Sequence, residues 1–322
     1  MICIVKKHRL FPAIFLIFFS TGQLSAQDTG SGLDFLNIGP NARSLALSEA
    51  TTASIVGPSA IYSNPSLLAF DPNNSVEANY TLWVSNVNNQ FAAFNYRHHR
   101  MAFAFGVFNS SSDGFEARDT PGPSGGSFSV GYLSVAGAIA YSRGPLAAGI
   151  TTLYLREEVF QFIANGFAFS AGLSAKFMDD RILTGISIKN IGSMESLDQQ
   201  STRLPSSLNI GLNADLIEFT TSGFNDLPIL VSIKGNWQKP IEENSVSDYA
   251  GNNPKESYFT IGTNINAGDL FNIQAGYRFG PTERPIGFGL GMVIEPVRVN
   301  YAIIPFSTGY GTVHSFGVQY YF

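Results

Sequence analysis

Large apolar side chains alternate with small or polar ones from Ser75 to the end of the chain. The clearest case is the segment 271–279. One face there carries Phe271, Ile273, Ala275, Tyr277 and Phe279, and the other carries Asn272, Gln274, Gly276 and Arg278. Segments 167–177, 208–216 and 314–322 repeat the pattern. A period of two places alternate side chains on opposite faces of a β-strand, so most of the chain is predicted to be strand.

About fourteen such segments follow one another, each roughly the length that a tilted strand needs to cross the hydrocarbon of a bilayer. They begin near Ser75, Gln90, Met101, Phe128, Leu146, Gly166, Ile182, Pro205, Ile229, Tyr258, Leu270, Ile286, Arg298 and Val313. The stretch 126–143 fits either one long strand or two short ones, which leaves the count open by two. Stretches 110–125, 192–203 and 240–255 are polar and are expected to be long outer loops.

Alternation alone fits both a soluble β-sandwich and a membrane β-barrel, because each hides one face of its sheet. Composition favours the barrel: only 13% of residues are charged, against about 25% in soluble domains. The polar faces are rich in Gly, Ser, Asn and Gln, as a wet lumen tolerates, and aromatic residues often end the apolar rows. The last strand ends on Phe322, which we interpret as an outer-membrane assembly signal. The predicted fold is therefore all-β, a transmembrane antiparallel barrel of about 14 strands located in the outer membrane.

The first 26 residues are predicted to be a cleaved signal peptide. Basic residues precede an apolar stretch at 10–19, and Leu24-Ser25-Ala26 fits a cleavage site. The alternative is an N-terminal membrane anchor, for which the apolar stretch is too short. Cleavage would remove the single cysteine, Cys3, and leave an acidic chain unsuited to binding nucleic acid.

Residues 27–74 do not alternate and contain helix formers broken by Gly57-Pro58. They are expected to form a plug inside the barrel, since the lumen of about fourteen strands is too wide for its own side chains to fill. A mobile leader is the alternative. The predicted organisation is thus a signal peptide (1–26), a plug (27–74) and a barrel (75–322).

Two N-terminal stretches carry a family resemblance, namely FLNIGPNAR at 35–43 and GPSAIYSNPSLLA at 57–69. They resemble the N-terminal signature of the PorV/PorQ family, relatives of the FadL fatty-acid transporters, whose N-terminal hatch carries a turn like Asn64-Pro65. Further matches lie at 188–192, 275–280 and 301–306. Ser48-Glu49 departs from the pattern, because a glycine pair is common there. The resemblance implies a non-catalytic component of type IX protein secretion that binds secreted cargo or a surface attachment partner.

Few residues are candidates for catalysis or for metal binding. The adjacent His98 and His99 lack a third metal ligand nearby in sequence, and His314 and Ser315 point to opposite faces of a strand. We therefore predict no catalytic, cofactor-binding or metal residues and no enzymatic activity. Four cations are expected to face the lumen: Lys189, Lys234, Arg278 and Arg298. They either pair with other charges and anchor the plug, or bind an anionic head group.

Two functions remain open from the sequence. The first is a protein-interaction barrel of type IX secretion, with secreted cargo or other secretion components as partners besides outer-membrane lipid. The second is a FadL-like transporter of hydrophobic small molecules.

Overall fold

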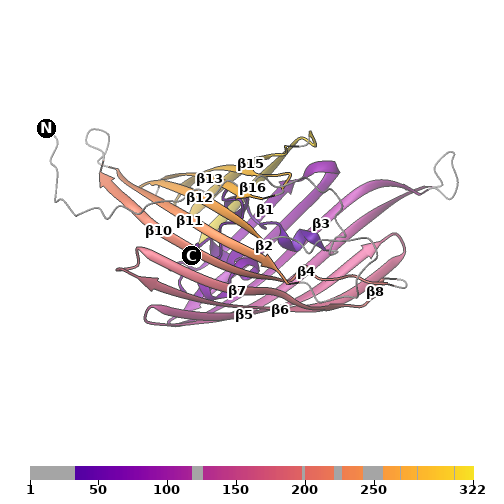
Figure 1. Ribbon diagram of the computed structural model, residues 1–322, viewed down its shortest axis with the longest axis horizontal. Coiled ribbons are helices and arrows are strands. Elements are labelled where there is room, and N and C mark those ends of the chain that lie inside the picture. Colours follow the sequence, from indigo (N-terminus) through magenta and orange to yellow (C-terminus); the bar gives the residue numbers. More distant parts are fainter. Residues whose placement is uncertain are drawn as a thin grey trace.

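The protein forms a closed antiparallel barrel (Figure 1) in a computed structural model that describes residues 33–117, 126–197, 200–220, 227–241, 257–268, 270–280, 282–307 and 309–322. Within these residues, fourteen strands close the barrel, and β1 pairs with β16 from Ser75 opposite Tyr321 to Leu82 opposite His314. The strands are β1 (Ser75–Leu82), β2 (Val87–His98), β3 (Met101–Ala117), β4 (Gly126–Arg143), β5 (Leu146–Val159), β6 (Phe162–Phe177), β7 (Ile182–Met194), β10 (Ser207–Thr220), β11 (Pro228–Pro240), β12 (Tyr258–Ala267), β13 (Phe271–Phe279), β14 (Ile286–Ile294), β15 (Val297–Pro305) and β16 (Thr312–Tyr321). The predicted fold class is confirmed, and the stretch 126–143 is one strand. A short hairpin, β8 (Ser196–Leu197) with β9 (Gln200–Ser201), lies outside the barrel sheet.

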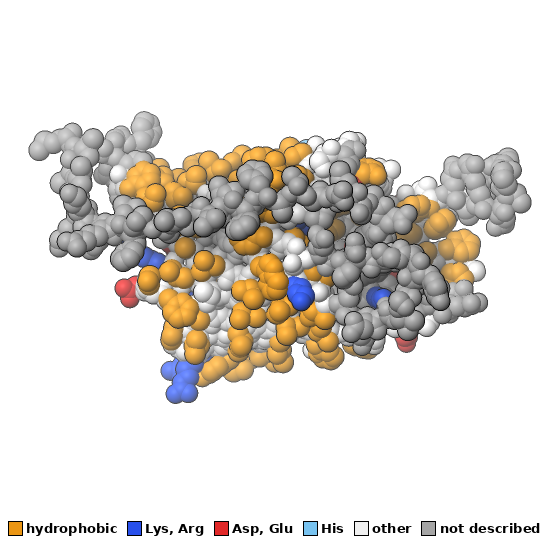
Figure 2. Space-filling view, in the orientation of Figure 1, with side chains coloured by type: hydrophobic (Ala, Val, Ile, Leu, Met, Phe, Trp, Pro, Cys, Tyr) orange, Lys and Arg blue, Asp and Glu red, His pale blue; other side chains and the backbone are white. Residues whose placement is uncertain are grey.

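The apolar rows face outward and the polar rows face the lumen. On β13, Phe271 and Ile273 are about half exposed, whereas Asn272 and Gln274 are buried. On β16, Ser315 and Gln319 are fully buried. Figure 2 shows hydrophobic side chains covering the barrel wall, with few charged side chains between them. An outer surface of this kind is stable only against hydrocarbon, because in water it would expose a continuous apolar band.

The strands differ in length around the barrel. β3 and β4 have 17 and 18 residues, whereas β13, β14 and β15 have 9 each. We call the end at which β1 begins and β16 ends the near end, and the opposite end the far end. Because β3 to β6 are longer than the other strands, they project beyond the far end (Figure 1), and we call this projection the extended wall. It consists of residues 113–117, 126–132 and 155–165. The expectation of a loop over 110–125 is wrong at its start, because β3 runs to Ala117, whereas β4 starts at Gly126, directly after the predicted end of the loop.

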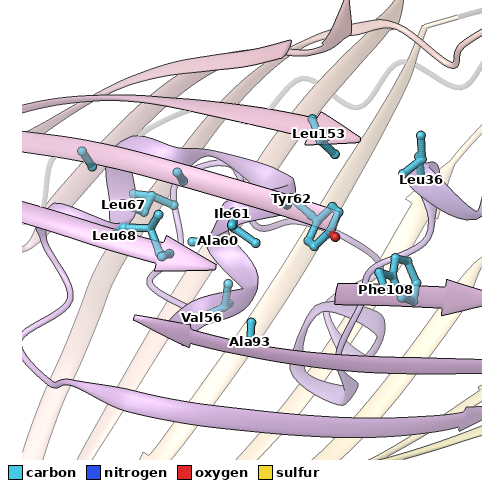
Figure 3. Packing of buried hydrophobic residues seen from close by; sticks show 14 of the residues in the cluster. Leu36, Val56, Ala60, Ile61, Tyr62, Leu67, Leu68, Ala93, Phe108 and Leu153 are labelled. Carbon is cyan, nitrogen blue, oxygen red and sulfur yellow. The ribbon is translucent and has the colours of Figure 1, made fainter. Parts of the chain in front are cut away.

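The plug segment, residues 33–71, lies inside the barrel. It contains five short helices: η1 (Asp34–Asn37), α1 (Ala42–Ala46), η2 (Gly57–Ser59), α2 (Ala60–Ser63) and η3 (Pro65–Ala69). Another short helix, η4 (Val84–Asn86), belongs to the β1–β2 turn. Figure 3 shows plug residues such as Ile61 and Leu67 packed among the strands, and both are fully buried. Burying apolar plug side chains against the wall fixes the segment by the hydrophobic effect.

None of the described helices is both long and apolar enough to cross a membrane. The signal peptide predicted for residues 1–26 lies outside the described residues, as does the predicted boundary at residue 27.

Candidate functional site: the plugged lumen

Glycines on facing strands bring the plug backbone against the wall. A Cβ at Gly276 would lie 2.3 Å from the carbonyl carbon of Leu47, and one at Gly172 would lie 1.9 Å from Oδ1 of Asn64. Both distances are far below van der Waals contact, so no larger residue fits. Inward glycines that pair across the sheet form a set that we call the glycine belt: Gly149 with Gly172, Gly185 with Gly211, and Gly262 with Gly276 and Gly287. The approach to the plug is close at each of them and loosest at Gly262, where an added Cβ would lie 3.0 Å from Cδ2 of Leu47.

Asn64 and Pro65 form the turn on which the plug is seated. Asn64 is fully buried and caps η3, because its Oδ1 accepts from the backbone N–H and the hydroxyl of Ser66. Its Nδ2 donates to the carbonyl of Thr52 (2.7 Å) and to Oγ of Ser174 on β6 (3.0 Å). The amide thus joins two parts of the plug to the wall, and Pro65 suits the first helical position because it needs no hydrogen-bond donor there.

Glu49 of the plug bridges two arginines of the wall. Its carboxylate forms ion pairs with Arg278 of β13 and with Arg284 of the β13–β14 loop, the latter at 2.5 Å. Burial alone would raise the pKa of Glu49, but the charges of Arg284 and Arg278 outweigh it and hold the pKa below its usual value. Ser48 and Glu49 both have positive φ (49° and 60°), which glycine adopts most readily. Here the side chain of Glu49 provides an ion-pair anchor that a glycine cannot.

The four cations expected in the lumen have different surroundings. Arg278 pairs with Glu49, and Nζ of Lys234 donates to Oδ1 of Asn213 at 2.5 Å. The guanidinium of Arg298 lies 5.6 Å from the ring centre of Tyr321. Lys189 lies on the lumen face of β7, opposite Ser207 of β10. Arg278, Lys234 and Arg298 therefore have different direct partners, and Lys189 lies near enough to Glu49 and Arg278 to interact with both charges. The sequence interpretation missed Glu49, Arg284 and Arg43, whose roles depend on where the plug sits.

A polar pocket of about 240 Å³ lies between the plug and the near end of the barrel. The plug side includes Arg43 and Ser54, and the wall side includes Lys234, Asp215, Asn213 and Asn264.

Aromatic rings form a strip from the extended wall to the plug. At the tip of the wall, Phe128 lies 5.4 Å from Phe115 and 5.7 Å from Phe160, measured between ring centres. Tyr132, on the same face of β4 as Phe128, stacks on Phe35 of the plug at 5.8 Å. Deeper in the lumen, Phe35 contacts Phe108, which contacts Tyr62. We call Phe160, Phe128, Phe115, Tyr132 and Phe35 the aromatic strip. Its outer rings are solvent-accessible, since Phe160 is 56% exposed.

Phe322 lies just beyond β16, where its N–H donates to the carbonyl of Asn74 and its ring stacks near Tyr320. Its role as an assembly signal stays a prediction. We expect deletion of Phe322 to reduce the amount of folded barrel in the outer membrane, whereas Phe279→Ala, which removes another outward aromatic, leaves it unchanged. Heat-modifiable gel mobility of isolated membranes measures the folded fraction, and equal amounts for deletion and wild type would contradict the prediction.

The rings of His98, the last residue of β2, and His99, in the β2–β3 turn, contact each other at a tilt of 45°, with their centres 4.2 Å apart. Among the described residues, no group of three or more His, Cys, Asp and Glu side chains is placed to hold a metal ion.

Comparison with known proteins identifies the fold. No family model and no curated protein sequence matches the chain. The solved structure of the Ralstonia pickettii toluene transporter TbuX matches with a TM-score of 0.55 at 15% identity, covering 88% of this chain and 98% of that one. The CymD monoaromatic hydrocarbon channel matches with a TM-score of 0.55 at 12% identity, covering 88% of this chain and 98% of that one. A Pseudomonas aeruginosa FadL homologue matches with a TM-score of 0.52 at 11% identity, covering 87% of this chain and 98% of that one.

The closed sheet, its apolar exterior and these matches define an outer-membrane β-barrel with the FadL-like fold. The predicted localisation is thereby confirmed, and the near end is the periplasmic end, where both termini of such barrels lie. The predicted FadL-like fold is shown, whereas none of the comparisons supports the narrower resemblance to the PorV/PorQ family.

Proposed function

We propose that this barrel carries hydrophobic small molecules across the outer membrane. The observation that carries the proposal is the aromatic strip, which leads from the exposed tip of the extended wall to the plug. In this strip the ring centre of Phe128 lies 5.4 Å from that of Phe115 and 5.7 Å from that of Phe160, distances typical of favourable aromatic pairs. Apolar compounds reaching the cell surface would leave water by adsorbing to these rings.

The fold supports the same function. Structures that match this chain include a toluene transporter and a monoaromatic hydrocarbon channel, and both are covered almost completely by the match. The plug explains how such a channel excludes water-soluble compounds, since its backbone meets the wall at the glycine belt. Movement of the plug would then open the path, with Glu49 as one of the contacts to be broken.

Uptake by whole cells tests the proposal. We expect expression in an outer-membrane host lacking FadL-type channels to raise the initial uptake rate of radiolabelled toluene or oleate. Phe128→Ala combined with Phe160→Ala should lower that rate on the order of tenfold, because each lost aromatic contact weakens adsorption by about 1 kcal/mol. Phe103→Ala, which removes a lipid-facing ring of β3, is the matched control. Uptake equal to that of vector-only cells would refute the proposal.

A protein-interaction role in type IX secretion is the second candidate, and the sequence motifs at 35–43 and 57–69 favour it. Most of their residues are buried in the plug, including Asn41, Asn64 and Pro65. Such residues determine how the plug folds and do not contact a partner outside the barrel, so we rank this role second. A pull-down of the tagged protein from outer membranes of its own host, read by mass spectrometry, distinguishes the two. Recovery of secreted proteins or secretion components would favour the interaction role, and recovery of the barrel with lipid alone would favour transport.

A further inference from the structure

We propose that the polar pocket at the periplasmic end binds a small oxyanion, a carboxylate or a phosphate group, between Arg43 of the plug and Lys234 of β11. This inference does not depend on the transport function, since it concerns only the pocket and its charges.

The first reason is an excess of buried positive charge. Arg43 and Lys234 line the same cavity of about 240 Å³. Of the other charges lining it, Lys176 is already paired with Asp180 at 2.7 Å, which leaves Asp215 as the one carboxylate near Lys234. Oδ1 of Asp215 accepts a hydrogen bond from Ser232. Two cations and one carboxylate leave the pocket with net positive charge, and buried charge without a partner is costly.

The second reason is the state of Arg43. Its Nη2 donates to the carbonyl of Ile55 at 3.3 Å, but its Nε is buried without a hydrogen-bond partner among the described residues. Burial and the nearby charge of Arg298 lower the pKa of Arg43 to about 10, against the opposite effects of Tyr321, Glu77 and Asp71. An anion in the pocket would give the guanidinium of Arg43, which lines the cavity, a close counter-charge.

The third reason is the chemistry of the lining. Besides Ser232, whose hydroxyl already donates to Asp215, hydroxyl and amide groups that can donate hydrogen bonds line the pocket: Ser54, Asn213, Asn264, Asn266 and Gln274. Oxyanions accept several hydrogen bonds at once, whereas an apolar ligand would leave these groups unsatisfied. The wall residues of the pocket lie toward the periplasmic ends of their strands, so the ligand would enter from the periplasm.

Isothermal titration calorimetry on the detergent-purified full-length protein tests the site. The probes are sodium phosphate and sodium acetate at constant ionic strength, with sodium chloride as reference. We expect saturable binding of at least one probe, and the preferred probe tells a phosphate from a carboxylate ligand. Lys234→Gln should weaken binding by about tenfold, since it removes a charged hydrogen-bond donor. Lys239→Gln, on the exposed face of the same strand, should bind as the wild type does.

A second variant guards against misfolding. Asn264→Asp places a negative charge in the pocket at nearly constant volume and should abolish binding, while circular dichroism and gel mobility confirm the folded barrel. The proposal is overturned if neither probe binds beyond the chloride reference, or if both pocket variants bind like the wild type. Binding of Ca²⁺ in place of either anion would also overturn the proposal, because it would show that the carboxylates lining the pocket form a cation site.

Discussion

Replacing Glu49 by Gln should loosen the plug, raise the conductance of the barrel in planar bilayers and lower its free energy of unfolding by about 3 kcal/mol. The reason is that Gln keeps the shape of Glu49 but leaves Arg278 and Arg284 buried without their counter-charge. The side chains of all three residues are only 10–14% exposed, so water compensates little.

Acid should have the same effect as the substitution, in a defined pH range. Because the arginines lower the pKa of Glu49 in the folded protein, the ion pairs contribute fully above its ordinary value of 4.5. Their contribution is lost as the pH falls below 4.5 through the lowered value. Wild-type conductance should therefore stay low down to about pH 4.5 and rise only in stronger acid.

The matched control is Glu158→Gln. Glu158 pairs with Arg156 at 3.1 Å, but their side chains are 50% and 40% exposed, and exposed pairs contribute little. We expect its conductance and stability to equal those of the wild type. A Glu49→Gln barrel with wild-type conductance and unfolding would show that the ion pairs do not hold the plug.

The barrel itself was predictable because each strand has one lipid face and one lumen face. That requirement imposes a period of two on nearly every segment. The pattern predicted the correct first residue of six strands: β1, β3, β5, β7, β12 and β14. The ends of β3 and β4 were not predictable in the same way. Ser110 to Ser112 look like loop although they still pair with β2, because Ser110 and Ser112 are buried on the lumen face, where small polar residues are tolerated, and Asp113-Gly114 follow them.

The lumen was harder to predict, because its contacts join residues far apart in the chain. The cation Arg278 was identified from its place on a polar face, but its partner Glu49 lies 229 residues away in a segment without periodicity. Glycines of the belt look like turn or small lumen residues in the sequence. Their common role appears only once the strand register pairs Gly262 with Gly276 and Gly276 with Gly287.

The glycine belt gives the other large prediction. Gly276→Val should displace the plug from its position against β13. The new Cβ would lie 2.3 Å from the carbonyl carbon of Leu47 and 2.5 Å from the backbone nitrogen of Ser48. Backbone atoms cannot move aside as a flexible side chain does, so we expect a loss of about 3 kcal/mol or more of stability. Limited proteolysis should then cut the plug segment, and conductance should exceed that of Glu49→Gln.

Gly137→Val is the control that separates a steric effect from the general cost of replacing glycine in a strand. Gly137 lies on the lipid face of β4, where an added Cβ meets no heavy atom within 4 Å. Valine there also suits a strand facing hydrocarbon. We expect a protease-resistant plug and wild-type conductance for Gly137→Val. If Gly276→Val behaves the same way, the plug does not depend on close contact with the wall, and the ion pairs of Glu49 must hold it alone.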